Sequence, residues 1–391
     1  MPPARLDWRE LSPDRFLERY WQREPLLWRQ ALPGFQSPIT RHDLAELACQ
    51  DEADARLVVH EPDAEPPWTV QHGPFDQADF DDLPAQGWTL LVQAVDAWLP
   101  AVADLITAFD FLPTWRLDDI MVSHAVSAGG VGPHIDQYDV FLLQAAGKRR
   151  WRYGSRSGSS LAFRADLDLR ILETFEPTHE AILEPGDILY LPPGVAHEGV
   201  AVDDACLTFS IGFRAPGVAD LASRFADAVA EFAEHQGDTA PRYADPGMTR
   251  PADPTLIGDE AVATMTTLLQ RQLDTPALLR QAIGELVTEP RVPPTMPDKQ
   301  IEPATVSARI GAGDTLERVM GSRWAHLSLG TDALLCVDGV CRQTDANLAA
   351  ALCGSETVEQ TRLSRWQDEP GLWALLAELV SQGSLAWHDR D

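Results

Sequence analysis

The chain has 391 residues and carries 31 Lys and Arg against 60 Asp and Glu, a formal net charge of −29. This length allows two or three domains, each with a hydrophobic core of its own. The charge argues against general nucleic-acid binding, which needs basic patches to neutralise phosphates. An acidic surface would instead attract a basic protein partner, although the acidity is also what solubility alone would explain.

Two helices are predicted near the N-terminus. Ser12 is a suitable N-cap, and Pro13 suits the first position of the helix that follows. The aromatic residues that come next at helical spacing, Phe16, Tyr20 and Trp21, are expected to lie in the core. A second helix is predicted over residues 41–48.

The middle of the chain, from Asp119 to Phe213, has short β-runs separated by Gly and Pro. The predicted strands include residues 140–143, 150–153, 188–191 and 207–213. Many short strands with turn signals between them indicate a β-sandwich or a β-barrel.

Three residues in this β-region have the spacing of a metal site. His134 and Asp136 are two apart, so both side chains point to the same face of a strand. His197 follows the apolar strand 188–191 and a Pro-Pro-Gly turn that fixes its position. Two imidazoles and one carboxylate form a facial triad, which holds Fe(II) and leaves coordination positions open for an organic acid and O2. The predicted chemistry is therefore an oxidation.

Two other histidines are alternatives for the third ligand. His179 follows Pro177 in a polar segment, and we interpret it as a loop histidine. His124 lies on a strand and points away from the face of Ser123, so we interpret it as an outward-facing histidine.

The oxidation needs a source of electrons, and no haem, flavin or nicotinamide motif is visible. 2-Oxoglutarate would serve, because its keto-acid end chelates iron while its far carboxylate pairs with a cation. The strand start Lys148-Arg149-Arg150 offers such a cation. Strand alternation alone does not choose among these three residues, and the alternative interpretation is a solvated basic strand end.

A second set of residues suits a substrate. Asp119, Met121 and Ser123 alternate along a predicted strand and share one face. If that face is inward, Asp119 must be hydrogen-bonded or meet a cation, which makes it a candidate substrate anchor. Tyr138 is two residues after Asp136, so it is expected to share the strand face of His134 and Asp136. A carboxylate, an aromatic ring and a methionine suit a guanidinium, although Met121 and Tyr138 could equally be ordinary core residues.

The chain becomes helical after residue 215, with helices predicted over residues 218–234, 260–273 and 276–287. Their apolar stripes permit dimerisation but could equally pack within one chain. Residues 289–297 are rich in proline and are expected to form a linker.

A small α+β module is predicted at the C-terminal end. It contains a strand over 324–329, a hairpin that turns at Asp338-Gly339, and helices over 347–352 and 371–382. A winged-helix-like arrangement fits this order of elements. Cys336 and Cys341 flank the hairpin turn and are expected to face each other across the strands.

The remaining cysteines and the apolar runs bear on the compartment. Cys49, Cys206 and Cys353 are expected to be small buried apolar residues, because five cysteines are too few and too scattered for a disulfide framework. The N-terminus lacks the apolar run of a signal peptide, and no segment of about eighteen apolar residues is present. We expect a soluble, cytoplasmic protein with no membrane partner.

The motif segments together resemble a known family. Two segments are similar to the bacterial JmjC-type ribosomal oxygenases. The first is Gly129-Gly130-Val131-Gly132-Pro133-His134-Ile135-Asp136-Gln137-Tyr138-Asp139-Val140-Phe141, together with the strand start Lys148-Arg149-Arg150-Trp151 that follows it. The second is Glu18-Arg19-Tyr20-Trp21-Gln22-Arg23-Glu24-Pro25-Leu26-Leu27. The resemblance implies a double-stranded β-helix (jelly-roll, cupin-like) domain with N-terminal helices over residues 1–215. It also implies a helical, homodimer-forming region over 216–290 and a linker with a winged-helix-like domain over 291–391.

The resemblance further implies an activity: a 2-oxoglutarate-dependent arginine 3-hydroxylase, using Fe(II) and O2, that acts on large-subunit ribosomal protein sixteen. Carried over by position, it assigns iron binding to His134, Asp136 and His197, and 2-oxoglutarate binding to Arg149 with Ser123 as a second contact. It assigns the substrate arginine to Asp119, Met121 and Tyr138. Alternatives are a histidine hydroxylase, a lysine demethylase, or a non-catalytic cupin-like module that binds proteins.

Overall fold

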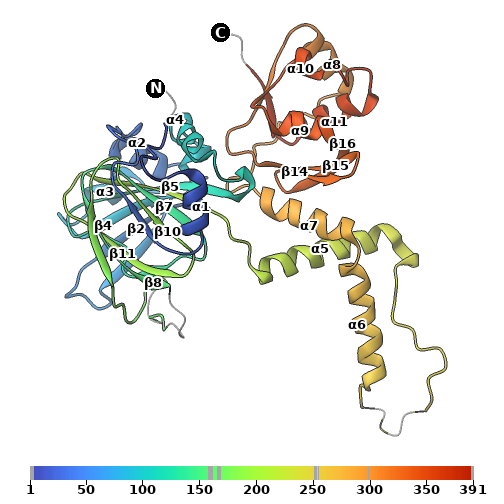
Figure 1. Cartoon of the computed structure of the whole chain (residues 1–391), viewed down its shortest axis with the longest axis horizontal. Coiled ribbons are helices and arrows are strands. Elements are labelled where there is room, and N and C mark those ends of the chain that lie inside the picture. The colour runs from blue at the N-terminus through green and yellow to red at the C-terminus, as the bar shows by residue number, and fades with distance from the viewer. Residues whose placement is uncertain are drawn as a thin grey trace. The chain divides into compact units, whose positions relative to one another are not determined.

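The computed structural model describes residues 4–156, 162–164, 169–250, 253, 255–297 and 299–388. The chain divides into two compact units, Met1–Ala215 and Pro216–Asp391 (Figure 1). In the described part of the chain, no helix is long and apolar enough to cross a membrane.

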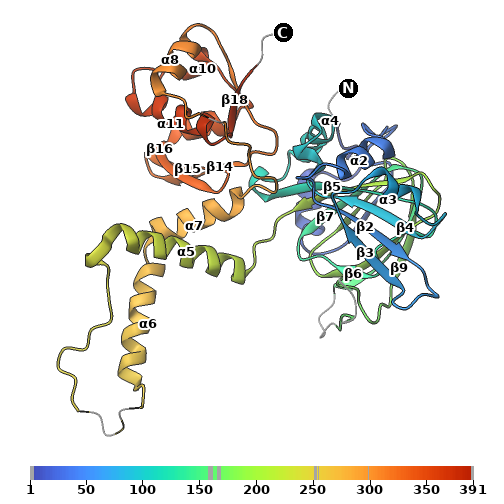
Figure 2. The same cartoon turned by 180° about the vertical axis from the view of Figure 1, so that it is seen from behind.

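The first unit consists mainly of two antiparallel sheets (Figure 2). The eight-stranded sheet has the order β1 (Leu26–Trp28), β10 (Ile188–Leu191), β7 (Asp139–Ala146), β12 (Cys206–Phe213), β5 (Leu117–Ala125), β4 (Trp88–Val92), β2 (Ala55–His60) and β3 (Trp68–His72). The four-stranded sheet has the order β6 (His134–Ile135), β11 (Val195–Ala201), β8 (Arg149–Arg156) and β9 (His179–Leu183). The four strands predicted from the sequence all lie within these elements.

The eight-stranded sheet is covered on both faces. Val140 and Leu142 of β7 pack with Trp151 and other residues of the four-stranded sheet. Phe141 and Leu143, which alternate with them, pack on the opposite face among residues of the N-terminal segment. This two-sided burial explains the uninterrupted apolar run in β7, because both sets of side chains leave water.

The N-terminal helices cover the outer face of this sheet. α1 (Pro13–Arg19) begins after Ser12, whose side chain accepts a hydrogen bond from Arg15 N, and α2 (Arg41–Ala48) has the predicted bounds. Phe16 is fully buried, as predicted. Its ring packs edge-on against Tyr190 of β10, 5.0 Å between centroids. Shorter helical elements follow: α3 (Gln77–Asp81), η1 (Val95–Ala97), α4 (Pro100–Ala103), η2 (Asp104–Phe109) and η3 (Thr114–Arg116).

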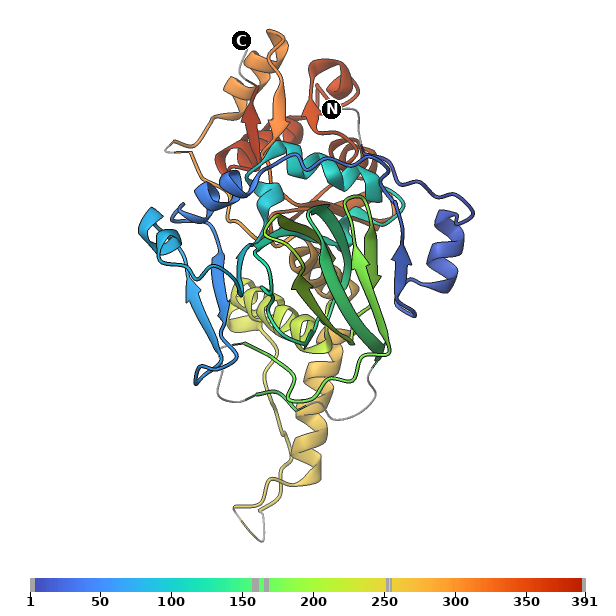
Figure 3. The ribbon, with the colours of Figure 1, turned by 90° about the vertical axis from the view of Figure 1, so that its left-hand side faces the viewer.

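Like β1 at the other edge of this sheet, the strands β2, β3 and β4 were not predicted from the sequence. They pair in the order β5-β4-β2-β3 and extend the sheet beyond β5. Figure 3 shows the N-terminal segment at one edge of the strands and the β2–β3 hairpin at the other. β2 and β4 have clear strand signals, the runs Leu57-Val58-Val59 and Leu90-Leu91-Val92, which lie just N-terminal to the predicted β-region.

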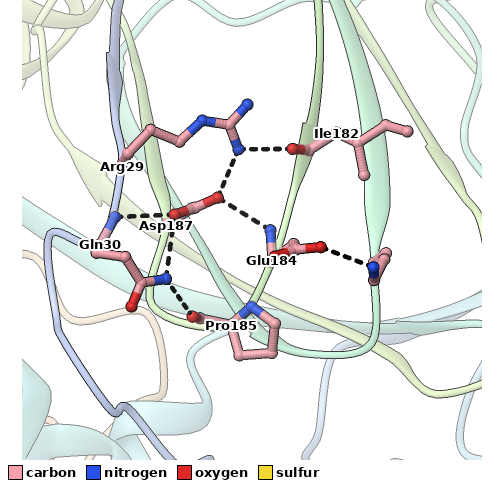
Figure 4. Close-up of polar contacts among 7 residues, drawn as sticks. Arg29, Gln30, Ile182, Glu184, Pro185 and Asp187 are labelled. Atoms are coloured by element: carbon pink, nitrogen blue, oxygen red, sulfur yellow. Dashed lines mark hydrogen bonds and ion pairs between the residues drawn. The ribbon is translucent and has the colours of Figure 1, made fainter.

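A cluster of polar contacts fastens β1 to the turn between β9 and β10 (Figure 4). The buried carboxylate of Asp187 accepts hydrogen bonds from Arg29 Nη1 (2.6 Å), Gln30 N (2.8 Å) and Glu184 N (3.1 Å). The carboxylate thereby fixes the start of β10, the strand that leads into the turn before His197.

The second unit begins with three helices, α5 (Val218–Gln236), α6 (Asp259–Leu273) and α7 (Pro276–Thr288), close to the predicted bounds. A small α+β module with its own core follows. Its elements are α8 (Pro303–Gly311), β13 (Leu316–Arg318), β14 (Trp324–Leu329), β15 (Asp332–Val337), β16 (Val340–Asp345), α9 (Ala346–Cys353), β17 (Thr357–Val358), α10 (Gln360–Leu363), α11 (Pro370–Ser381) and β18 (Leu385–Trp387).

The predicted hairpin at Asp338-Gly339 is present between β15 and β16. Both turn residues have positive φ, +49° and +80°, which a two-residue hairpin turn requires. Cys336 and Cys341 are paired across the strands, as expected, and form a disulfide. Gly284 of α7 lies against the two sulfur atoms, where a side chain would clash, so α7 packs directly on this hairpin. Of the three other cysteines, Cys206 is buried as expected, while Cys49 and Cys353 are only partly buried.

Candidate metal centre and cosubstrate pocket

The three predicted metal ligands come together at the edge of the four-stranded sheet. His134 lies on β6 and pairs in register with His197 on β11. Asp136 follows one residue after the end of β6, so it belongs to the turn after the strand. One ligand atom from each residue lies within 4.8 Å of the others. The distance to a carboxylate oxygen of Asp136 is 3.5 Å from His197 Nε2 and 4.0 Å from His134 Nε2.

The backbone orients both imidazoles toward a common point. His134 Nδ1 lies 3.0 Å from Gly132 O, and His197 Nδ1 lies 3.0 Å from Val195 O. Because a carbonyl only accepts, Nδ1 carries the proton in each ring and Nε2 is left as the lone-pair donor to a metal. Burial and the neighbouring His134 lower the pKa of His197 to about 4. This histidine is therefore neutral at physiological pH, the form that binds metal ions.

The two alternative histidines lie outside this group. His179 is the first residue of β9 and stacks on Tyr153 with a centroid distance of 5.0 Å, so the interpretation as a loop residue was wrong. His124 points away from the face of Ser123 as predicted, but it is only 4% exposed and packs edge-on against Trp88. The orientation away from the metal group is therefore confirmed, and the side chain is buried because other residues cover that face of the sheet.

A cavity of about 380 Å³ adjoins the three residues and runs between the two sheets. Its wall contains most of the side chains that were predicted to bind cosubstrate or substrate: Ser123, Arg149, Met121 and Tyr138. The cavity is partly apolar, with Leu142 and Trp151 among its other lining residues. Such a pocket, with a few convergent polar groups at defined points, suits a small organic acid.

The structure distinguishes the three basic residues at the start of β8. Lys148 pairs with Glu184 near the surface (2.7 Å), and Arg150 is exposed. Arg149 is 4% exposed and lines the cavity. Its Nη2 is buried with no hydrogen-bond partner among the described residues. A buried guanidinium with spare donors fits a carboxylate ligand, which would pair its charge.

Asp119 is buried and hydrogen-bonded, as expected for an inward-facing carboxylate. It shares the strand face of Met121 and Ser123 and is buried, but it does not form part of the cavity wall. Its Oδ2 accepts a hydrogen bond from Ala94 N (2.9 Å). With its amide oriented to satisfy both neighbours, Gln93 donates to Asp119 Oδ2 (3.1 Å) and accepts from Arg56 Nη2 (2.7 Å). Asp119 therefore lies behind the cavity wall and contacts Gln93, a residue that lines the cavity.

Several wall residues were missed by reasoning from the sequence. Arg56 and Val58 on β2, Leu91 on β4 and Gln93 just after it contribute to one side of the cavity. They were missed because β2 and β4 were not predicted. Ser210 of β12 was also missed, although it pairs with Met121 and therefore shares its inward face.

The fold and the site define a class of protein: an oxygenase with a double-stranded β-helix and a His-Asp-His metal site. A JmjC domain family model matches residues 104–221, and a ROXA-like winged helix family model matches residues 269–386. The chain belongs to the JmjC-type ribosomal oxygenases. The predicted fold class, with its winged-helix-like C-terminal domain, is thereby confirmed.

Particular relatives agree over nearly the whole chain. The ribosomal protein uL16 3-hydroxylase of Escherichia coli (strain K12) is 36% identical over 373 residues, 94% of this chain and 95% of the relative. A probable ribosomal oxygenase of Haemophilus influenzae is 42% identical over 212 residues, 54% of this chain and 52% of the relative. The solved structure of the E. coli ribosomal oxygenase YcfD in complex with cobalt and 2-oxoglutarate has a TM-score of 0.82 and 34% identity, and the match covers 99% of this chain and 100% of that one.

Proposed function

We propose that this chain is an Fe(II)- and 2-oxoglutarate-dependent oxygenase that hydroxylates Cβ of an arginine in ribosomal protein uL16. The observation that carries the proposal is the combination of an oriented His134–Asp136–His197 group with a buried, partly unsatisfied Arg149 in the same cavity. The former suits Fe(II), and the latter suits the distal carboxylate of the cosubstrate. The substrate is inferred from the E. coli relative, a ribosomal protein uL16 3-hydroxylase whose sequence aligns with nearly the whole of this chain.

The reaction consumes one 2-oxoglutarate and one O2 for each arginine hydroxylated, and releases succinate and CO2. The iron supplies the oxidising chemistry when bound. The protein's own residues place the reactants: Arg149 and Ser123 hold the cosubstrate, and the walls of the cavity keep the target carbon near the metal position. Placement matters because it decides which C–H bond of the substrate lies nearest to the metal position.

We assign the substrate arginine to the part of the wall formed by Met121 and Tyr138, with Asp119 as its anionic partner. Met121 and Tyr138 both line the cavity, and a guanidinium is stabilised by an aromatic face and a polarisable sulfur. Asp119 lies behind this part of the wall, where its Oδ2 accepts hydrogen bonds from Ala94 N and from the amide of Gln93. A carboxylate favours arginine over the neutral side chain that a histidine hydroxylase would bind.

The deciding experiment is anaerobic loading with Fe(II) and 2-oxoglutarate, followed by exposure to air with recombinant uL16 and tandem mass spectrometry. A gain of one oxygen on an arginine, dependent on 2-oxoglutarate and lost in Asp136→Ala, supports the proposal. A modified histidine or a removed methyl group would instead indicate one of the other activities found in this superfamily. No turnover of 2-oxoglutarate by metal-loaded protein would favour a protein-binding module.

We further propose that the chain has three regions: a catalytic region over 1–215, a helical region over 216–290 and a winged-helix-like region over 291–391. The helical region mediates homodimerisation. None of the described residues of α6 is buried. Its apolar side chains recur on one face and are about half exposed or more: Val262, Met265, Leu269 and Leu273. A second copy would cover this stripe. The winged-helix family match begins at residue 269, so α7 contributes to both regions.

Replacing Leu269 by Glu tests the dimer, because a buried unpaired carboxylate is costly at an interface. Gln270→Glu is the matched control, since it adds the same charge at a neighbouring exposed position. Sedimentation equilibrium of the full chain should give a dimer for the control and a monomer for Leu269→Glu. A monomeric wild-type protein at micromolar concentration would overturn the proposal.

The cytoplasm, where ribosomal proteins are made, is the compartment that we assign to this chain.

A further inference from the structure

Polar side chains cross the inner face of the eight-stranded sheet next to Arg149. The register places Ser123 of β5 beside Thr208 of β12, and Thr208 beside Gln144 of β7. Cys206 lies two residues before Thr208 and therefore shares its face. Thr208, Gln144 and Cys206 are at most 1% exposed, so this polar group is sealed from solvent. Buried polar atoms in such a position need hydrogen-bond partners within the protein or a ligand.

These side chains form a directed chain of hydrogen bonds that ends at Arg149. Thr208 Oγ1 donates to Gln144 Oε1 (3.1 Å), which leaves the amide nitrogen of Gln144 to face Ala146 O (2.7 Å) and Cys206 Sγ (3.6 Å). Arg149 Nε also donates to Cys206 Sγ (3.3 Å). The sulfur is therefore an acceptor toward both neighbours, one of which carries a full positive charge.

The contact with Cys206 determines how the guanidinium is oriented. The guanidinium is planar, so tying Nε to the sulfur fixes the plane in which both Nη groups lie. Arg149 Nη2 is buried and has no partner among the described residues. An apolar residue at position 206 would leave Nε unpaired as well, and the guanidinium would be free to turn toward other acceptors.

We propose that Cys206 is a positioning residue for the cosubstrate: its sulfur orients the Arg149 guanidinium toward the distal carboxylate of 2-oxoglutarate, and Gln144 and Thr208 maintain that contact. The inference rests on the proposed function, because it presupposes that Arg149 binds this carboxylate. It adds that the affinity for 2-oxoglutarate depends on a buried thiol that does not itself form part of the cavity wall.

The test measures binding to the full chain loaded with Mn(II) under anaerobic conditions, by isothermal titration calorimetry. The probes are 2-oxoglutarate and pyruvate, which has the same 2-oxo acid end but no distal carboxylate. Cys206→Ala should weaken 2-oxoglutarate binding about tenfold, the size of one hydrogen bond to a charged group, and leave pyruvate binding unchanged. Cys206→Ser, which keeps an acceptor, should restore most of the affinity. Cys49→Ala is the matched control.

A double-mutant cycle separates positioning from general structural damage. In the Arg149→Met background, Cys206→Ala should cause no further loss, because the group through which it acts is gone. Thr208→Val, which removes the hydroxyl that orients Gln144, should cause a smaller loss of the same kind. Wild-type affinity in Cys206→Ala, or an equal loss for pyruvate, would overturn the inference. If the wild-type protein itself binds no 2-oxoglutarate, the proposed function fails before the inference is reached.

Discussion

The role of Asp119 is best tested by a substitution that the structure itself selects. Asp119 Oδ2 accepts the backbone N–H of Ala94, a non-glycine residue in the left-handed region with φ of +50°. Asp119→Ala would leave this buried N–H without its acceptor, at a cost of about 1–3 kcal/mol, in a turn that is already strained. A loss of activity in that variant would be ambiguous. Asp119→Asn keeps an oxygen for Ala94 N and removes only the charge.

The expected effect of Asp119→Asn is specific to the protein substrate. Removing one partner of a hydrogen-bonded charge pair in a desolvated site costs about 2–5 kcal/mol, so kcat/KM for an arginine-containing uL16 peptide should fall at least about thirtyfold. Affinities for Mn(II) and 2-oxoglutarate should not change, because Asp119 lies outside the metal group and the cavity wall. The assay is peptide hydroxylation followed by mass spectrometry, with chemical denaturation of both Asp119 variants.

Either of two outcomes would refute this reasoning. If Asp119→Asn retains kcat/KM within about threefold of wild type, the carboxylate serves the Ala94 turn and the substrate guanidinium has another partner. If Asp119→Asn and Asp119→Ala lose stability equally, the amide oxygen does not replace the carboxylate at Ala94, and the separation of the two roles is wrong.

Further predictions concern the metal, the cosubstrate and the fold. Asp136→Ala should abolish measurable Mn(II) binding by electron paramagnetic resonance, and retained affinity would contradict the three-residue site. Arg149→Met should raise the KM for 2-oxoglutarate at least tenfold with little change in kcat at saturation, and an unaltered KM would contradict its role. Asp187→Asn should lower the free energy of unfolding at neutral pH by about 1–3 kcal/mol. Burial raises the pKa of Asp187, but hydrogen bonds from Gln30, Glu184 and Arg29 outweigh this effect and hold the pKa below its usual 3.8. Its stabilisation is therefore present above that value and lost as the pH falls, so the two urea-unfolding curves should converge in acid.

The elements predicted most accurately are those with strong local signals at their ends. α2 has the predicted bounds, residues 41–48, because Thr40 and Asp43 form a capping box at its start. β10 has the predicted bounds 188–191 because Gly186 lies just before the strand and a Pro-Pro pair ends it. The hairpin at Asp338-Gly339 likewise depends on four residues that are adjacent in the sequence.

The features that were missed depend on contacts between distant segments. Strand alternation correctly placed His124 and Ser123 on opposite faces, but it carries no information about what covers each face. Arg149 was not distinguishable from its neighbours on the strand because its burial depends on β12, more than fifty residues later. Asp119 was placed on the correct face, yet Gln93 and Ala94 lie in a segment that had not been recognised as part of the sheet.

The junction between β1 and the β9–β10 turn has a consequence for biosynthesis. Gln30 and Asp187, which meet there, are 157 residues apart in the sequence. At a synthesis rate of roughly 5–20 residues per second, the N-terminal strand waits about 8 to 30 seconds before its partner strand exists. During that interval β1 has no partner strand, because it pairs with β10. β1 therefore joins the sheet only after β10 is made, and the metal site is completed only as His197 follows.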